Sequence, residues 1–159
     1  MKNFTVSSIG LCLLLLLSQS FSANAQISVY PIQDFNFGTF YHGNAGGTIT
    51  VYTDGLRSST GDIVLLNSNV SVSQAIFDID APADAVISIS SLNSTLNRTE
   101  GGSMALEITG SNPASPFINK AVATERTRIS FSGRLIVGDA AANPPGIYQG
   151  TFSVTFSYQ

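Results

Sequence analysis

Residues 151–158, at the C-terminal end of the chain, alternate between apolar and hydroxyl side chains. The apolar positions are Phe152, Val154, Phe156 and Tyr158, and the hydroxyl positions between them are Thr151, Ser153, Thr155 and Ser157. A period of two residues is typical of a β-strand with one dry face and one wet face, because successive side chains of a strand point to opposite sides. The end of the chain is therefore predicted to lie over a hydrophobic core.

The rest of the chain after residue 25 repeats this pattern in short segments. β-Branched residues, serine and aromatic residues dominate, and glycine, proline, asparagine or aspartate recurs between the segments. The strands expected before the terminal one cover residues 27–32, 35–41, 48–52, 63–66, 75–79, 86–90, 104–108 and 128–137. This pattern of about eight or nine strands without an amphipathic helix predicts an all-β fold, an antiparallel immunoglobulin-like β-sandwich. A closed barrel is the alternative.

Three local features add detail to this prediction. Asp54-Gly55 predicts a tight turn between two strands. The uninterrupted apolar run at residues 63–66 predicts a strand that is buried on both sides. His42 is expected in an exposed loop that follows a strand.

The N-terminal residues have the layout of a secretory signal peptide. Lys2 is followed by a leucine-rich run at residues 9–17, and Ala23-Asn24-Ala25 forms a small-residue cleavage site. The apolar run is much shorter than the roughly 20 residues that a membrane-spanning helix needs. Cleavage after Ala25 is therefore expected, with residues 1–25 removed and residues 26–159 forming one domain with no integral membrane segment.

Charge and cysteine content narrow the function classes. The chain carries 7 Lys and Arg against 10 Asp and Glu, and loss of Lys2 with the leader takes the net charge from −3 to −4. No basic patch is visible, which argues against a nucleic-acid partner. Cys12, the single cysteine, lies in the leader. Without a disulfide, the mature domain has to be stabilised by its apolar core.

The chain offers few groups for catalysis. His42 is the single histidine, and neither a cysteine nor a nucleophile motif accompanies it. The usual nitrogen and sulfur ligands of zinc are missing as well. Gly46-Gly47 is not followed by the lysine and helix of a phosphate-binding loop. We therefore expect no enzyme, no catalytic residue and no cofactor.

Two other groups of residues are candidate binding sites. Asp78, Asp80 and Asp84 form the best acidic cluster, but their spacing matches no calcium loop, and a solvated outer face is favoured over a metal site. Tyr30 and Tyr41, like Tyr52, lie on different early strands, so an aromatic platform for sugars is an alternative that the sequence does not favour.

Several motifs, taken together, resemble a family of secreted bacterial proteins known as a domain of unknown function. The motifs are DFNFGTF at residues 34–40, GGTITV at 46–51 with TGDIVLL at 60–66, and FSGRLIVG at 131–138 with PGIYQGTF at 145–152. Arg57 belongs to the same set, where a turn or salt-bridge role is favoured. That family is similar in turn to spore coat protein U and to fimbrial subunits. The resemblance implies a pilin-like variant of the sandwich.

The fimbrial resemblance also implies functional positions. Pilins assembled by a chaperone and an usher end in an alternating strand with a penultimate tyrosine and a glycine fourteen positions from the end. Tyr158 and Gly146 occupy these positions here, and Tyr148 lies between them. The resemblance implies that the terminal strand pairs with a periplasmic chaperone or with other surface subunits, and that Ile27 and Val29 form a candidate donor segment.

The chain departs from that pattern in two respects. It lacks the disulfide that many pilins carry, and Pro31 cuts short the alternation of the N-terminal segment. The leading hypothesis is an exported, non-enzymatic structural or assembly subunit at the surface of a Gram-negative bacterium. It would be secreted to the periplasm or to the outer cell surface. A monomeric adhesin or glycan-binding module is the alternative.

Overall fold

The computed structural model describes residues 26–122 and 125–158 of the chain. The expected signal peptide, residues 1–25, lies outside the described residues, and so does Gln159. Within the described residues every regular element is a β-strand, and the pairings between strands are antiparallel. The predicted all-β class is confirmed.

Ten strands follow one another along the described chain. They are β1 (Ser28–Gln33), β2 (Thr39–Val51), β3 (Arg57–Leu66), β4 (Ala75–Asp80), β5 (Val86–Ser91), β6 (Ser94–Asn97), β7 (Ser103–Asn112), β8 (Phe117–Ile118), β9 (Thr127–Val137) and β10 (Val154–Tyr158).

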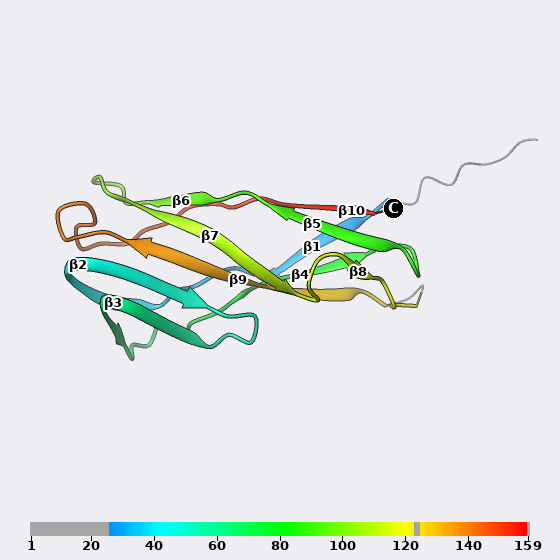
Figure 1. Ribbon diagram of the computed structural model, residues 1–159, viewed down its shortest axis with the longest axis horizontal. Helices are drawn as coiled ribbons and strands as arrows, with labels where there is room; N and C mark the ends of the chain where they lie inside the picture. The colour runs from blue at the N-terminus through cyan, green and yellow to red at the C-terminus, as the bar shows by residue number, and fades with distance from the viewer. Residues whose placement is uncertain (1–25, 123–124, 159) are drawn as a thin grey trace, which may run out of the picture.

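The strands form two sheets that pack as layers of a sandwich (Figure 1). The larger sheet has seven strands in the path β1-β4-β9-β2-β3, with β7 on the remaining edge of β9 and β6 beside β7. The smaller sheet has three strands in the order β10-β5-β8. Two separate sheets correspond to the predicted sandwich and not to a closed barrel.

Strand β9 organises the larger sheet because it pairs along both edges. Phe131 pairs with Ala75 of β4 on one edge and with Ser111 of β7 on the other. Further along, Gly133 pairs with Val51 of β2 opposite β7. Strands β4 and β2 therefore lie one after the other along a single edge of β9. The predicted alternation holds, since every second residue of β9 from Ile129 to Val137 is buried.

Two adjoining clusters make up the core. One lies under β2, β3, the first half of β7 and the second half of β9, and contains Phe37, Ile49, Val51, Ile63, Met104, Leu106, Leu135 and Val137. The other lies between the smaller sheet and the β4–β9 region, and contains Ala75, Ile79, Ile87, Ile129 and Phe131. Phe35, Ile108 and Phe152 pack against both clusters and connect them.

The region around the paired glycines differs from the prediction. Strand β2 runs unbroken from Thr39 to Val51, so His42 lies within a strand and is half-buried, and the expected exposed loop is wrong. The pairing with β3 shifts between His42 and Gly47. Gly46 has φ +66°, and a Cβ there would lie 2.4 Å from the carbonyl oxygen of Val137. A glycine lets β2 bulge here without leaving the sheet.

Strand β3 corrects a second expectation. Val64 is 55 % exposed and Leu66 is 42 % exposed, so the run at 63–66 is buried on one side and not on both. The reason is that the smaller sheet packs on only one face of the larger sheet, so the side chains of β3 that point to the other face meet solvent. The predicted turn before β3 is confirmed, because the Gly55 N–H donates to the Tyr52 carbonyl at 3.0 Å and the Leu56 N–H to Asp54 Oδ1 at 3.0 Å.

The side chain of Arg57 bonds to main-chain groups at the start of β2, just before it, and at the end of β3. Its guanidinium donates to the carbonyl oxygens of Phe37 at 2.7 Å, Thr39 at 3.2 Å and Leu66 at 3.1 Å. All three partners are main-chain carbonyls held by charge-assisted bonds, so of the two predicted roles, a turn or a salt bridge, these bonds serve the first. This arrangement joins the start of β2 to the end of β3.

Candidate functional site

The terminal strand β10 lies at the edge of the smaller sheet, and its alternation follows the predicted pattern as far as Phe156, whereas Tyr158, predicted on the dry face, is 39 % exposed. Val154 and Phe156, with Phe152 just before the strand, face the core, while Thr155 and Ser157 are exposed. All three core-facing residues remain only half-buried, whereas Ile87 on the neighbouring strand β5 is fully buried. The inner face of β10 is therefore incompletely covered.

Aromatic rings hold β10 to the larger sheet. Phe156 lies 6.3 Å from the rings of both Phe77 and Phe131, measured between centroids. Phe152 lies 5.3 Å from Phe35 and 6.1 Å from Phe77. These separations fall within the range of favourable tilted and edge-to-face ring contacts. The terminal strand is thus held against the larger sheet by its side chains.

The backbone of β10 is paired along one edge. The Leu92 N–H donates to the Ser153 carbonyl at 3.3 Å, and the register of β10 with β5 continues from Val154–Ser91 to Tyr158–Ile87. In an antiparallel ladder, alternate residues turn their N–H and C=O groups toward the same neighbour. Ser153 and Thr155 therefore face β5, and the main-chain groups of Val154 and Phe156 face the opposite edge. No described strand pairs with β10 on that side.

Gly146 and Tyr148 lie in the loop before β10 and not on its open edge. A Cβ at Gly146 would lie 2.4 Å from Cδ of Arg98, so this glycine allows the loop to lie against the arginine stem. Tyr148 is half-buried and donates from its hydroxyl to the Pro144 carbonyl at 2.8 Å. The structure therefore separates these two positions from the four that were predicted along the terminal strand.

The candidate donor segment is incorporated in its own domain. Ile27 packs against the core cluster beneath the smaller sheet. Val29 lies in β1, where it pairs with Ile79 of β4 and is 41 % exposed. In this arrangement, residues 28–33 form a strand of the same chain. Whether they also serve a neighbour stays a prediction.

The residues considered for catalysis or metal binding do not form one group. The two ring nitrogens of His42 face main-chain carbonyls, with Nε2 at 2.8 Å from the Asn143 oxygen and Nδ1 at 3.2 Å from the Gly43 oxygen. The histidine thus fastens β2 to the loop after β9. Among the described residues, no three His, Cys, Asp or Glu side chains lie close enough to hold a metal ion.

Asp78 is engaged in an ion pair on the outer face of the larger sheet. Arg128 of β9 donates through Nε to Oδ1 at 2.9 Å and through Nη2 to Oδ2 at 3.0 Å. Beside this pair, the guanidinium carbon of Arg126 lies 3.6 Å from the centre of the Tyr30 ring. The hydrogen bond from Arg128, and then its charge, hold the pKa of Asp78 below its ordinary value of 3.8.

Replacing Asp78 with asparagine is expected to remove a small, pH-dependent part of the stability. Since the pKa of Asp78 is lower in the folded than in the unfolded protein, the pair stabilises the fold above the unfolded pKa. This contribution disappears as the pH falls through the folded pKa. Thermal unfolding at pH 7 and at pH 2–3 should show a lower midpoint for Asp78→Asn at pH 7 and a smaller difference in acid. An equal difference at both pH values would contradict the role of the charge.

Tyr30, Tyr41 and Tyr52 do not form a shared platform. Tyr41 is 64 % exposed and pairs with Val64, while Tyr52 precedes the turn at Asp54-Gly55 and bonds Ser58 Oγ at 2.9 Å. Arg126 already covers one face of the Tyr30 ring. Their positions therefore offer no common surface on which a sugar could stack.

Sequence reasoning missed a gap on the other side of β5. Ser115 lies in the loop between β7 and β8, and its hydroxyl accepts a hydrogen bond from the Ile89 N–H at 2.8 Å. Ser115 and Ser91, which lies next along the gap, do not stand out in a serine-rich sequence. The gap could have been recognised only from the assignment of β5 and β7 to different sheets.

Comparison with known proteins finds one family. The family model described as Domain of unknown function (DUF4402) matches residues 27–158. No curated protein and no solved structure matches the chain. The match bears out the expected domain of unknown function and does not extend to spore coat protein U or fimbrial families. In the part of the chain that the structure describes, no helix has the length and hydrophobicity needed to cross a bilayer.

Proposed function

Since this chain belongs to the DUF4402 family, whose description assigns no function, we propose from the geometry that it is an exported, non-enzymatic assembly subunit of a bacterial surface structure. The proposal includes the signal peptide at residues 1–25, export to the periplasm or outer surface of a Gram-negative cell, and the likeness to spore coat and fimbrial subunits. Its partners are other copies or other surface subunits.

The observation that carries the proposal is the open edge of β10. An exposed edge strand presents N–H and C=O groups to which another chain can add a strand. Here the same strand also leaves Phe152, Val154 and Phe156 half-covered. A strand added at this edge would pair with the main chain of Val154 and Phe156 and would cover their side chains as well.

The same edge explains why a chaperone belongs in the proposal. Before assembly, an uncovered strand with apolar side chains is an aggregation hazard. A periplasmic chaperone that covers β10 would remove this hazard until a subunit replaces it. The alternative of a monomeric adhesin or glycan-binding module receives no comparable support, because Tyr30 lies in β1 while Tyr41 and Tyr52 lie near the two ends of β2.

Proline substitutions at neighbouring positions of β10 can distinguish the role of its open edge from that of its paired edge. Val154→Pro removes an N–H that faces the open edge, and a proline is tolerated on an edge strand when its missing N–H faces solvent. We expect this variant to fold and to lose self-association or chaperone binding at least tenfold. Sedimentation velocity of the exported protein, over a range of concentrations, measures the association.

The adjacent substitution is the matched control. Thr155→Pro removes an N–H that faces β5, so it should disrupt the sheet and prevent folding, as circular dichroism would show. A Val154→Pro protein that folds and assembles as well as the original would refute the open-edge proposal. A chain that stays monomeric at every concentration and binds no chaperone would refute the assembly function altogether.

A further inference from the structure

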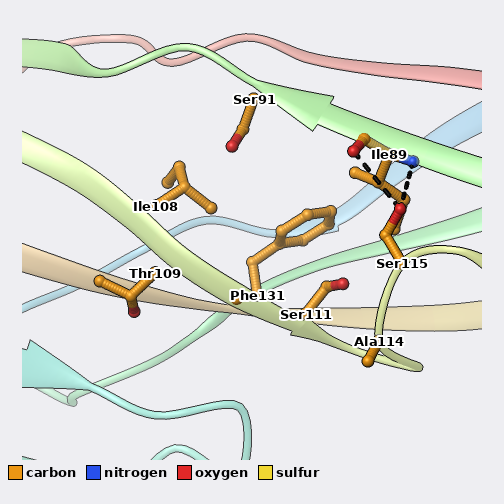
Figure 2. Close-up of a pocket in the computed structure, with 9 residues that line it drawn as sticks. Ile89, Ser91, Ile108, Thr109, Ser111, Ala114, Ser115 and Phe131 are labelled. Carbon is orange, nitrogen blue, oxygen red and sulfur yellow. Dashed lines mark hydrogen bonds between the residues drawn. The ribbon is translucent and has the colours of Figure 1, made fainter.

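A cavity of about 310 Å³ opens between β5 of the smaller sheet and β7 of the larger sheet (Figure 2). Strand β6 covers β7 only along Ser103–Leu106, and β8 covers β5 only at Val86 and Ile87. Beyond these points the facing edges of β5 and β7 have no described strand between them. We call this opening the β5–β7 slot; its lining residues are Ile89, Ser91, Ile108, Thr109, Gly110, Ser111, Ala114, Ser115 and Phe131.

The floor of the slot is apolar and its walls carry no charge. Ile89, Ile108 and Phe131 point into it in Figure 2, and every lining residue is neutral. Most of the hydroxyls on its rim are already bonded within the protein. Ser111 Oγ donates to the Pro113 carbonyl at 2.8 Å and Thr109 Oγ1 bonds Ser132 Oγ at 2.9 Å. A sugar would need several free polar groups, so the slot is better suited to an apolar side chain.

The backbone at the slot suggests that this side chain arrives on a peptide. Ser115 Oγ accepts from the Ile89 N–H at 2.8 Å and lies 3.4 Å from the Ile89 carbonyl, in the place where a neighbouring strand would bond. The next residue with the same orientation is Ser91, because the Leu92 N–H faces β10 and the main-chain groups of successive residues along β5 point to opposite edges. The N–H and C=O of Ser91 therefore point into the slot, where a visiting main chain can reach them.

The described part of the chain presents one matching group. Ile147 is 78 % exposed, more than any other large apolar side chain there. It lies on the loop between β9 and β10, and residues 140–149 carry no charge. An uncharged segment with one protruding aliphatic side chain is complementary to the neutral, apolar slot.

The loop that carries Ile147 is held in shape by several bonds. The Tyr148 hydroxyl donates to the Pro144 carbonyl at 2.8 Å, and Arg98 Nη1 lies 3.4 Å from the Pro145 carbonyl. Gln149 and Asn97 exchange main-chain bonds of 2.7 and 3.0 Å. A segment that is ordered before it binds loses little conformational entropy on binding, so this geometry favours a contact site.

We propose that Ile147 of one copy inserts into the β5–β7 slot of a second copy. The loop follows β9 at one end of the molecule, whereas the slot lies between β5 and the half of β7 that β6 leaves uncovered (Figure 1). Two different surfaces meet in such a contact, so each copy can use both and chains of copies can grow. This inference rests on the proposed assembly function and names a second contact, separate from the β10 edge.

Cysteine cross-linking tests the contact, because the single natural cysteine, Cys12, belongs to the expected leader. Pro145→Cys places a thiol beside Ile147, and Ala114→Cys places one on the exposed rim of the slot. Mixing the two single variants under mild oxidation should give a disulfide-linked dimer. The chain that carries both substitutions should give a ladder of oligomers on a non-reducing gel.

Two controls keep this test specific. Ser90→Cys lies on β5 with its side chain on the outer face of the smaller sheet, so it should cross-link to Pro145→Cys at least tenfold less than Ala114→Cys does. Adding Ile147→Glu to the Pro145→Cys variant should reduce the dimer at least tenfold. Leu56→Glu, at another exposed apolar position (66 %), should not reduce it.

The outcomes distinguish the two contacts. If both cysteine pairs react equally, or if Ile147→Glu has no effect, the insertion of Ile147 is refuted. If the protein associates in a Val154-dependent manner without the cross-link, the assembly function stands and this inference falls. A chain that remains monomeric and forms no cross-link would refute both the assembly function and the insertion of Ile147.

Discussion

Phe156→Asp is expected to lower the free energy of unfolding by about 3–5 kcal/mol, enough to prevent folding or export in a domain of ordinary stability. The ring of Phe156 packs between Phe77 and Phe131, at 6.3 Å from each. A carboxylate in this position would lie against two aromatic rings, and its desolvation adds to the lost aromatic contacts. Urea unfolding of the purified variant, or its yield in the periplasm, measures the effect.

The neighbouring Thr155→Asp provides the matched control. Thr155 faces outward on the same strand and is exposed, so a carboxylate there remains in water. Its effect should stay within about 0.5 kcal/mol, as is usual for surface substitutions. Equal effects at the two positions would mean that the inner and outer faces of β10 are not distinct.

The sequence predicted those elements whose side chains alternate over one core. Strand β9 is the best example, because every second residue from Ile129 to Val137 is buried or fills a core position, as expected. The terminal strand has the predicted faces up to Phe156, although its regular part begins at Val154 and not at Thr151, and Tyr158 is exposed. In both strands the period of two comes from one-sided burial, which a single sequence records directly.

Features that depend on contacts between distant segments could not be predicted. The sequence of β6 is polar and short, and it becomes a strand because β7 pairs with it. The run at 63–66 is apolar throughout, yet Val64 is exposed because its side chain points to the outer face of the larger sheet. Composition alone does not show which face of a sheet a second layer covers.

The candidate site was predictable to the same extent. The apolar face of β10 follows from alternation, but its open edge follows from the sheet order β10-β5-β8. The β5–β7 slot depends on where β6 and β8 end, and its serines resemble many others in the sequence. The role of His42 as a fastening for the loop likewise required the position of Asn143, 101 residues away.

Asn143 is the residue that anchors the loop after β9, and it is 1 % exposed. Its Nδ2 donates to the Ser103 carbonyl at 2.6 Å, and its Oδ1 accepts from the Gly138 N–H. Its own carbonyl lies 2.8 Å from Nε2 of His42. One buried amide thus connects β2, the start of β7 and the loop that presents Ile147.

Asn143→Asp is expected to destabilise the protein by about 3–5 kcal/mol at pH 7, although it changes neither size nor shape. The introduced carboxylate would place an oxygen against the Ser103 carbonyl, and only its protonated form can donate there. Its pKa should therefore be raised in the folded protein, so stability falls as the pH rises above the ordinary carboxyl value near 4. Urea unfolding should show a large deficit at pH 7 that shrinks toward pH 4. An Asn143→Asp protein with the same deficit at both pH values would contradict the donation to Ser103, and a Gln149→Glu variant, exposed on the same loop, should show little effect at either.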